Sequence, residues 1–287
     1  MENKTLIGKN NYLFLINDSC KELEVHCNNL ILIKDQNLSH LNFKNYMLIV
    51  FPNKSLYYKK YLPDQYHIKF RPSFDIYKNI LKDKILDGYE YVNDDEEDLY
   101  YKTDAHINLK GSYIIYLEFI KKCNSLYNTN LTPKVININV LNNVELSLLN
   151  LGIGDLTWSH NLGNQVLEDK KDNYYYSDDI QYFYLRYVIK KDNEYVFYDY
   201  GLINKTDELD NKVVTWDEIS KYIIYKKNVL RKHKAIIFYD SFLLNTISLY
   251  MELFYEVYMV KNCYNNHLIN VINPDYVFEF RIERFLL

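Results

Sequence analysis

Short apolar runs without clean polar alternation are the feature of this sequence that most constrains its fold. Each run is four to six residues long and rich in branched or aromatic side chains, and longer segments separate the runs. Strands that are apolar at successive positions are covered on both faces, as in a parallel or mixed central sheet. The runs predict strands at residues 13–16, 30–33, 46–51, 135–140, 235–239 and 276–280.

The segments between these runs carry helical patterns. Apolar residues at three-to-four spacing predict helices over 73–84, 109–126, 216–225 and 242–255. Strands alternating with helices predict an α/β fold with three α/β/α layers. Two Tyr/Val/Ile-rich stretches around Lys191-Asp192-Asn193 predict a β-hairpin insertion at about 182–200. No Pro-rich linker or repeat divides the chain, so we expect one domain over residues 1–287.

Charge and composition exclude several classes of protein. The net charge is −4, and no basic run is long enough to neutralise a string of phosphates, which argues against a nucleic-acid partner. No apolar run reaches the roughly 18 to 20 residues that span a bilayer. The four cysteines are scattered without zinc-finger spacing, so we expect neither a metal nor a cofactor. The first residues lack the pattern of a secretion signal, which predicts a cytoplasmic protein as the sequence stands.

The sharpest local pattern is an apolar strand that ends in Asp240-Ser241 and is followed by an amphipathic segment. A serine at such a strand-to-helix turn is exposed at the carboxyl edge of the sheet. Backbone N–H groups at the start of the helix can stabilise an oxyanion beside it. The alternative is a plain helix N-cap, because Asp and Ser are preferred caps whatever the function.

A serine nucleophile needs a base, and His106 is the best candidate among seven histidines. Only His106 has a carboxylate, Asp104, two residues earlier. In an extended segment the two side chains point the same way, so Asp104 could orient the imidazole. Alternatively, Asp104 or Thr103 caps the following helix and His106 merely packs beside it.

A glycine-containing segment, Gly152 to His160, stands out in a chain with only seven glycines. Glycine under such compositional pressure marks a backbone conformation that other residues avoid. The segment predicts a turn near the cleft, and His160 is the reserve candidate for the base. A purely structural turn is the alternative.

Taken together, these motifs resemble the alginate O-acetyltransferase family of SGNH hydrolase-like proteins, the AlgX/AlgJ type. The resemblance covers about residues 8–284, and its specificity comes from order and spacing. The motifs that carry it are Asp104-x-His106-x-Asn108, Gly154-Asp155-Leu156 and Asp240-Ser241-Phe242 in the middle and late chain, with Gly8-Lys9-Asn10-Asn11-Tyr12-Leu13-Phe14-Leu15, Phe51-Pro52-Asn53-Lys54 and Asn273-Pro274-Asp275-Tyr276-Val277-Phe278-Glu279 near the ends.

The resemblance implies an SGNH hydrolase-like fold with permuted motif order, since the serine follows the Asp/His pair. It implies Ser241 as nucleophile, His106 as base and Asp104 as its orienter, and an acetyl-serine intermediate that passes its acetyl group from a donor to a glycan hydroxyl. Alginate-type enzymes work outside the cytoplasm, so the resemblance suggests that location if a leader precedes the chain. The candidate substrate-binding residues are Asn108, Lys54, Tyr57 and Asp155.

Two other functions stay open at this point. A carbohydrate esterase or deacetylase would use the same site and pass the acetyl group to water. A non-catalytic glycan-binding protein would keep the scaffold and stack sugars on tyrosines such as Tyr57, Tyr101 and Tyr182.

Overall fold

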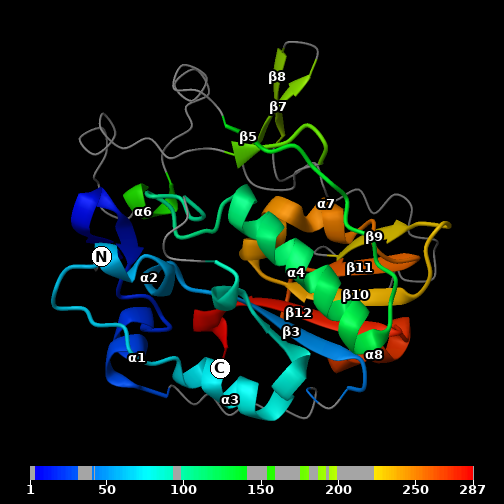
Figure 1. Cartoon of the computed structure of the whole chain (residues 1–287), viewed down its shortest axis with the longest axis horizontal. Coiled ribbons are helices and arrows are strands. Elements are labelled where there is room, and N and C mark those ends of the chain that lie inside the picture. The colour runs from blue at the N-terminus through cyan, green and yellow to red at the C-terminus, as the bar shows by residue number, and fades with distance from the viewer. Residues whose placement is uncertain are drawn as a thin grey trace.

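A six-stranded sheet forms the centre of the computed structural model, which describes residues 4–31, 41, 43–92, 98–140, 154–158, 175–180, 187–191, 194–198 and 223–286. The strand order is β4-β3-β12-β10-β11-β9 (Figure 1). All neighbours pair in parallel except β9, which pairs antiparallel with β11. The strands are β3 (Tyr46–Phe51), β4 (Ile85–Asp87), β9 (Ile223–Lys227), β10 (Lys234–Tyr239), β11 (Glu256–Val260) and β12 (Tyr276–Ile282).

Helices cover both faces of this sheet. One face packs against α4 (Leu109–Tyr127) and α7 (Ile247–Tyr250), and the other against α3 (Pro72–Leu81) and α8 (Asn266–Ile272). Figure 1 shows α4 running across the sheet. Successive residues of β3 contribute to opposite layers, Leu48 to one and Ile49 to the other, and every residue of the strand is buried. The three-layer α/β/α architecture predicted from the unbroken apolar runs is therefore confirmed.

The remaining elements lie around the central sandwich. The predicted hairpin within 182–200 is present as the antiparallel pair β7 and β8. These peripheral elements are β1 (Thr5–Ile7), β2 (Leu13–Leu15), β5 (Asn139–Val140), β6 (Tyr175–Tyr176), β7 (Tyr187–Lys191), β8 (Glu194–Tyr198), α1 (Glu22–Asn28), α2 (Lys54–Tyr57) and α6 (Asp155–Trp158), with 3-10 turns at Lys9–Asn11, Lys59–Tyr61, Lys82–Lys84, Gly88–Glu90, Ser241–Thr246 and Glu283–Phe285.

Several predicted elements are wrong or shorter than expected. Residues 30 and 31 are not in a strand, and 32–33 lie outside the described residues. Only the last two residues of the 135–140 run pair as a strand. The predicted helix over 216–225 fails at 223–225, which pair with β11, and its earlier part is not described. The helix expected over 242–255 is a 3-10 turn and α7, followed by turns and bends.

No helix among the described residues is long and apolar enough to cross a membrane.

Candidate active site

A pinched loop carries Asp104 and His106. An antiparallel bridge joins Tyr100 to Ile107, and the Asn108 N–H donates to the Leu99 carbonyl at 2.8 Å. The loop therefore precedes α4 directly, and the hydrogen bonds between its two ends, residues 99–100 and 107–108, fix where its tip lies. Asn108 caps α4 by accepting from the Gly111 N–H at 3.1 Å, so neither Asp104 nor Thr103 is the helix cap.

The tip of this loop is a turn, not the extended segment that the sequence suggested. Asp104 Oδ1 accepts the backbone N–H of His106 at 2.8 Å, the pattern of an Asx turn. The same oxygen lies 2.7 Å from His106 Nδ1. The Asp104 carboxylate and the His106 imidazole therefore meet as the sequence predicted. A tight turn brings them together, however, and not the alternation of side chains along an extended segment.

The other ring nitrogen of His106 meets Ser241. The distance between His106 Nε2 and Ser241 Oγ is 2.8 Å. With Nδ1 donating to the Asp104 carboxylate, Nε2 is the acceptor for the serine O–H. The three residues therefore form a continuous hydrogen-bonded chain from carboxylate to imidazole to hydroxyl.

Ser241 is held at the carboxyl end of β10 by the residue before it. Asp240 is buried, and its two oxygens accept the N–H groups of Phe242 at 2.9 Å and Ile282 at 2.7 Å. Asp240 is therefore a helix cap, as the alternative reading of this motif expected. It also ties the turn to the end of β12, and Ser241 is left to face His106.

Burial and charge set the proton affinities of the site. Burial penalises the charged forms of both groups, but the mutual attraction of Asp104 and His106 outweighs it. The pKa of Asp104 is therefore held well below its usual range, and the pKa of His106 is raised. An ionised Asp104 beside a more basic imidazole suits a proton acceptor for the serine.

The turn at Gly154-Asp155 packs directly on the loop. The Asp155 side chain accepts the Ala105 N–H at 2.9 Å, and its own N–H donates to Asp104 Oδ2 at 3.2 Å. A Cβ on Gly154 would lie 2.3 Å from the Thr103 carbonyl oxygen, so only glycine fits. A turn is present in this segment, where Gly154 leads into α6, and it lies beside the loop that carries Asp104 and His106; His160 lies outside the described residues.

Asp155 is also the second carboxylate near His106. Its Oδ2 lies 3.8 Å from His106 Nδ1, although about half of its side chain is exposed. Loss of hydration by partial burial and repulsion from Asp104 raise the pKa of Asp155 to about 6. Its charge in turn contributes to the raised pKa of His106.

Three of the candidate substrate-binding residues lie in supporting positions. The buried ammonium of Lys54 donates to the carbonyls of Lys102 at 2.7 Å and Asp104 at 2.9 Å, so it holds the loop backbone. Tyr57 and Asn108 are buried as well, Tyr57 in the core and Asn108 at the cap of α4. Asp155 is the one candidate of the four with an exposed side chain. Substrate contact stays a prediction for all four.

Asp104, His106 and Asp155 are also the group among the described residues whose donor atoms lie close enough together for a metal, within 4.8 Å. Asp104 Oδ1 and His106 Nδ1 share a hydrogen bond, and Asp155 Oδ1 accepts from the backbone. A cation here would have to displace these bonds, so the donor set fits a hydrogen-bonded triad better than a metal centre.

Sequence reasoning assigned no role to two residues at the site, although one of them, Phe242, stands in the motif that carries the resemblance. The Phe242 ring packs on the His106 ring with centroids 4.7 Å apart, and Asn245 donates to the Ile107 carbonyl at 2.8 Å. Their position one and four residues after Ser241, on the same turn, was the available signal.

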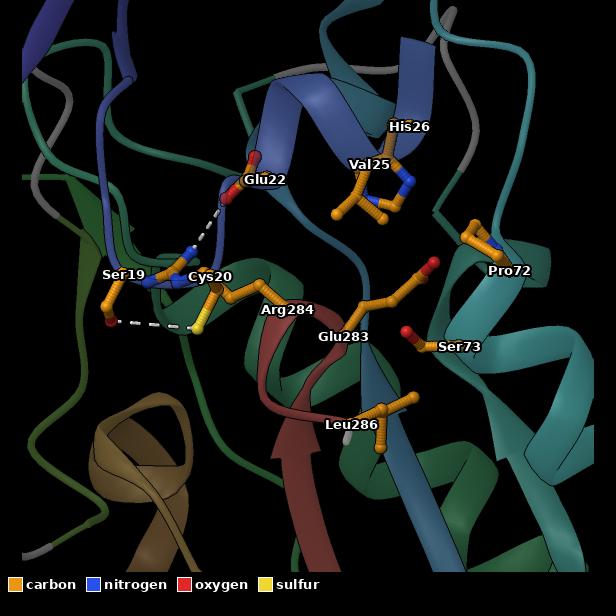
Figure 2. A pocket seen from close by; sticks show the side chains of 10 residues that line it. All are labelled: Ser19, Cys20, Glu22, Val25, His26, Pro72, Ser73, Glu283, Arg284 and Leu286. Carbon is orange, nitrogen blue, oxygen red and sulfur yellow. Dashed lines mark hydrogen bonds and ion pairs between the residues drawn. The ribbon is translucent and has the colours of Figure 1, made fainter. Parts of the chain in front are cut away.

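Arg284 contacts the candidate site on one side and lines a small cavity of about 30 Å³ on the other. Its guanidinium lies over the Phe242 ring, 5.4 Å from the centroid, and donates to Glu22 at 3.1 Å. Figure 2 shows that α1, the start of α3 and the C-terminal 3-10 turn surround this cavity. Glu22 and Glu283 along its wall are already paired, Glu22 with Arg284 and Glu283 with Arg71.

Comparison with solved structures gives the fold a wider context. Bacillus cereus PatB1 matches with a TM-score of 0.56 at 15% identity, covering 98% of this chain and 96% of that one. A DHHW family protein from Eubacterium siraeum gives 0.58 at 15% identity, over 100% and 93%. The O-acetyltransferase domain of Pseudomonas putida AlgJ gives 0.50 at 13% identity, over 99% and 92%. A PatB1 structure with a sulfonyl adduct also matches, with a TM-score of 0.56 at 14% identity.

No protein-family model matches the chain, and no curated protein matches it by sequence. The structural matches run over nearly the full length of both partners. The chain therefore shares the fold of these solved structures, as the resemblance of its motifs to the AlgX/AlgJ type predicted, at an identity that establishes the fold alone.

Proposed function

We propose that this protein is a carbohydrate O-acetyltransferase that works through an acetyl-serine intermediate. The observation that carries the proposal is the hydrogen-bonded chain from Asp104 through His106 to Ser241, with distances of 2.7 and 2.8 Å. Such an arrangement activates a hydroxyl that is otherwise a weak nucleophile. The likeness to an O-acetyltransferase domain of the same fold supports acetyl as the group transferred.

In the first half-reaction, Ser241 Oγ attacks the carbonyl carbon of a donor acetyl ester while His106 Nε2 takes the serine proton. The tetrahedral oxyanion collapses and the bond from the acetyl carbon to the donor oxygen breaks. The protonated His106 returns its proton to the departing oxygen, leaving acetyl-Ser241. Asp104 stabilises the imidazolium without taking its proton.

In the second half-reaction, a glycan hydroxyl loses its proton to His106 Nε2 and attacks the acetyl carbon. Ser241 leaves and is reprotonated by His106, so the enzyme is regenerated and the sugar carries an ester. The backbone N–H of Ser241, at the start of the 3-10 turn, is our candidate donor to the oxyanion of both steps.

An esterase or deacetylase is the nearest alternative, because water could replace the sugar hydroxyl in the second step. Partition of the acetyl group between sugar and water separates the two functions. A glycan-binding protein without chemistry is disfavoured, because binding alone gives no reason for a carboxylate, a histidine and a serine to form one hydrogen-bonded chain.

The test is to incubate the protein with a chromogenic acetyl ester and a panel of oligosaccharides. Chromophore release reports the first step, and mass spectrometry of the sugars reports the second. Ser241→Ala is the variant, and Ser248→Ala, at a serine of α7 whose hydroxyl is buried and lies outside the triad, is the matched control. Acetylated sugar that requires Ser241 supports a transferase. Ser241-dependent ester hydrolysis with every sugar unmodified supports an esterase.

A further inference from the structure

The turn between β9 and β10, residues 227–234, presents two apolar side chains at its tip. The Arg231 N–H donates to the Asn228 carbonyl at 3.1 Å, and the Leu230 N–H to the Asn228 side chain at 3.2 Å. The Asn228 N–H is tied to the Tyr255 carbonyl at 2.7 Å. These bonds define the turn and hold Val229 and Leu230 outward, where they are 78% and 89% exposed. We call residues 227–234 the basic turn.

Exposure of this degree at adjacent branched residues is unusual. Single exposed apolar residues need no explanation, but a neighbouring pair at an ordered tip gains free energy only if something apolar covers it. Among the large hydrophobic residues that the structure describes, Leu230 is the most exposed. Val229 and Leu230 therefore form a small exposed apolar tip that another apolar surface could cover. We call this pair of side chains the wedge.

Cationic side chains surround this wedge. Lys227 and Lys234 are both near Glu256, at 3.9 and 3.4 Å, so one carboxylate offsets only part of their charge. Arg231 and Lys232 have no salt bridge to a carboxylate of the described residues. The local charge is therefore positive, although the whole chain carries −4.

The histidine of the turn lies beside a carboxylate. His233 faces Asp275 at 3.8 Å, and both side chains are about half exposed. Glu252, a further carboxylate among the described residues, lies 3.7 Å from Lys134. The excess charge around the tip thus comes from Arg231 and Lys232 on its carboxyl side.

We propose that the basic turn docks the protein on an anionic membrane surface, with Val229 and Leu230 entering the interface and the cations contacting lipid phosphates. An apolar tip flanked by Lys and Arg matches both layers of such a surface, the charged headgroups and the hydrocarbon beneath them. A soluble polyanion would attract the same cations but would leave Val229 and Leu230 in water.

The position of the basic turn in the fold gives this docking a consequence. The turn precedes β10 and Ser241 follows it, so the wedge and Ser241 lie at opposite ends of one six-residue strand. Six residues of strand span about 20 Å. With β10 along the membrane normal, a protein docked by this turn would hold Ser241 about that far from the lipid. The docking itself stands independently of the proposed chemistry.

The experiment is co-sedimentation of the full chain with vesicles of phosphatidylcholine alone or with one third phosphatidylglycerol, at low and high salt. We expect binding to the anionic vesicles only, weakened by salt. Val229→Ser/Leu230→Ser should lose at least about tenfold in partition coefficient, and Arg231→Gln/Lys232→Gln about fivefold per charge removed. Ile7→Ser, at a half-exposed residue of β1, is the matched control and should bind like the wild type.

Three outcomes would overturn the proposal. Equal binding by the wild type and the Val229→Ser/Leu230→Ser variant would show that the wedge does not insert. Equal binding to both kinds of vesicle would show that the charges do not matter. Failure to bind any vesicle, with retention on a heparin column that Val229→Ser/Leu230→Ser leaves unchanged, would make this a polyanion site.

Discussion

Ser241 and His106 lie 135 residues apart in the sequence, and their side chains meet at 2.8 Å. Neither is placed by its own local structure alone. Ser241 is fixed by Asp240, which ties the end of β10 to the end of β12, whereas His106 sits on a loop whose two ends are bonded to each other. The contact therefore depends on two separately built supports, and each support makes a testable prediction.

Replacing Asp104 with Asn should lower kcat/KM for an acetyl ester by about 10³- to 10⁴-fold, because the carboxylate that accepts from His106 Nδ1 is lost. Loss of the charge also lowers the pKa of His106, so the acid limb of the remaining activity should move to lower pH. Steady-state pH profiles check both effects. A variant that keeps the wild-type rate would show that Asp104 does not orient the base.

Activity should fall as the pH drops through the raised pKa of His106, since only neutral imidazole can take the serine proton. Asp155 ionises near pH 6 and then helps to raise that pKa. Asp155→Asn should therefore shift the acid limb to lower pH, whereas Asp64→Asn at a remote exposed pair should not. A limb that moves equally in both variants, or to higher pH in Asp155→Asn, would contradict this electrostatic coupling.

Gly154→Ala should cost about 10- to 100-fold in kcat with a smaller change in KM, because the new Cβ must push on Thr103 and the Asp104 side chain, 2.5 Å away. Circular dichroism and thermal unfolding would separate this from global unfolding. Wild-type kcat in a folded variant would mean that the turn does not position the loop.

A buried ion network should dominate the stability of the region under the site. Arg71 donates to both Asp87 and Glu283, and all three side chains are largely buried. Arg71→Met leaves two carboxylates without their partner and should cost about 3 to 5 kcal/mol in the free energy of unfolding. Lys9→Met, which breaks the exposed pair with Asp64, should cost far less, because water screens that pair. Denaturant titration measures both, and equal losses would contradict the difference in burial.

The sequence predicts the centre of the fold well, for a physical reason. The run at 46–51 is apolar at every position because both faces of β3 are covered, and its bounds match the strand. The helix at α4 was predicted within one residue at its end, since its amphipathic pattern is long. A buried strand or a long amphipathic helix can be predicted because its apolar residues match the faces that the core covers.

Other elements depend on partners that no local pattern reveals. Residues 223–225 pair with β11 despite a helical pattern, because antiparallel partnership at a sheet edge outweighs weak local preference. The segment after Ser241 is apolar because the core surrounds it, and this resembles an amphipathic helix that does not form beyond Tyr250.

The candidate triad was accessible from sequence only as an ordered set of motifs. Composition and periodicity place Ser241 at the end of a strand, but they contain no distance to His106. The bond from Lys54 to the loop backbone and the bond from Ile282 to Asp240 were also inaccessible, because each joins groups far apart along the chain.

The most direct test of the proposed chemistry is intact-mass spectrometry after brief exposure to a chromogenic acetyl ester. We expect the wild type to gain about 42 Da, the mass of one acetyl group in a covalent intermediate, and the gain to map to Ser241. Ser241→Ala should show neither the adduct nor the burst of chromophore. An adduct that persists in folded Ser241→Ala, or no adduct and no ester cleavage by folded wild type, would contradict the acetyl-serine proposal.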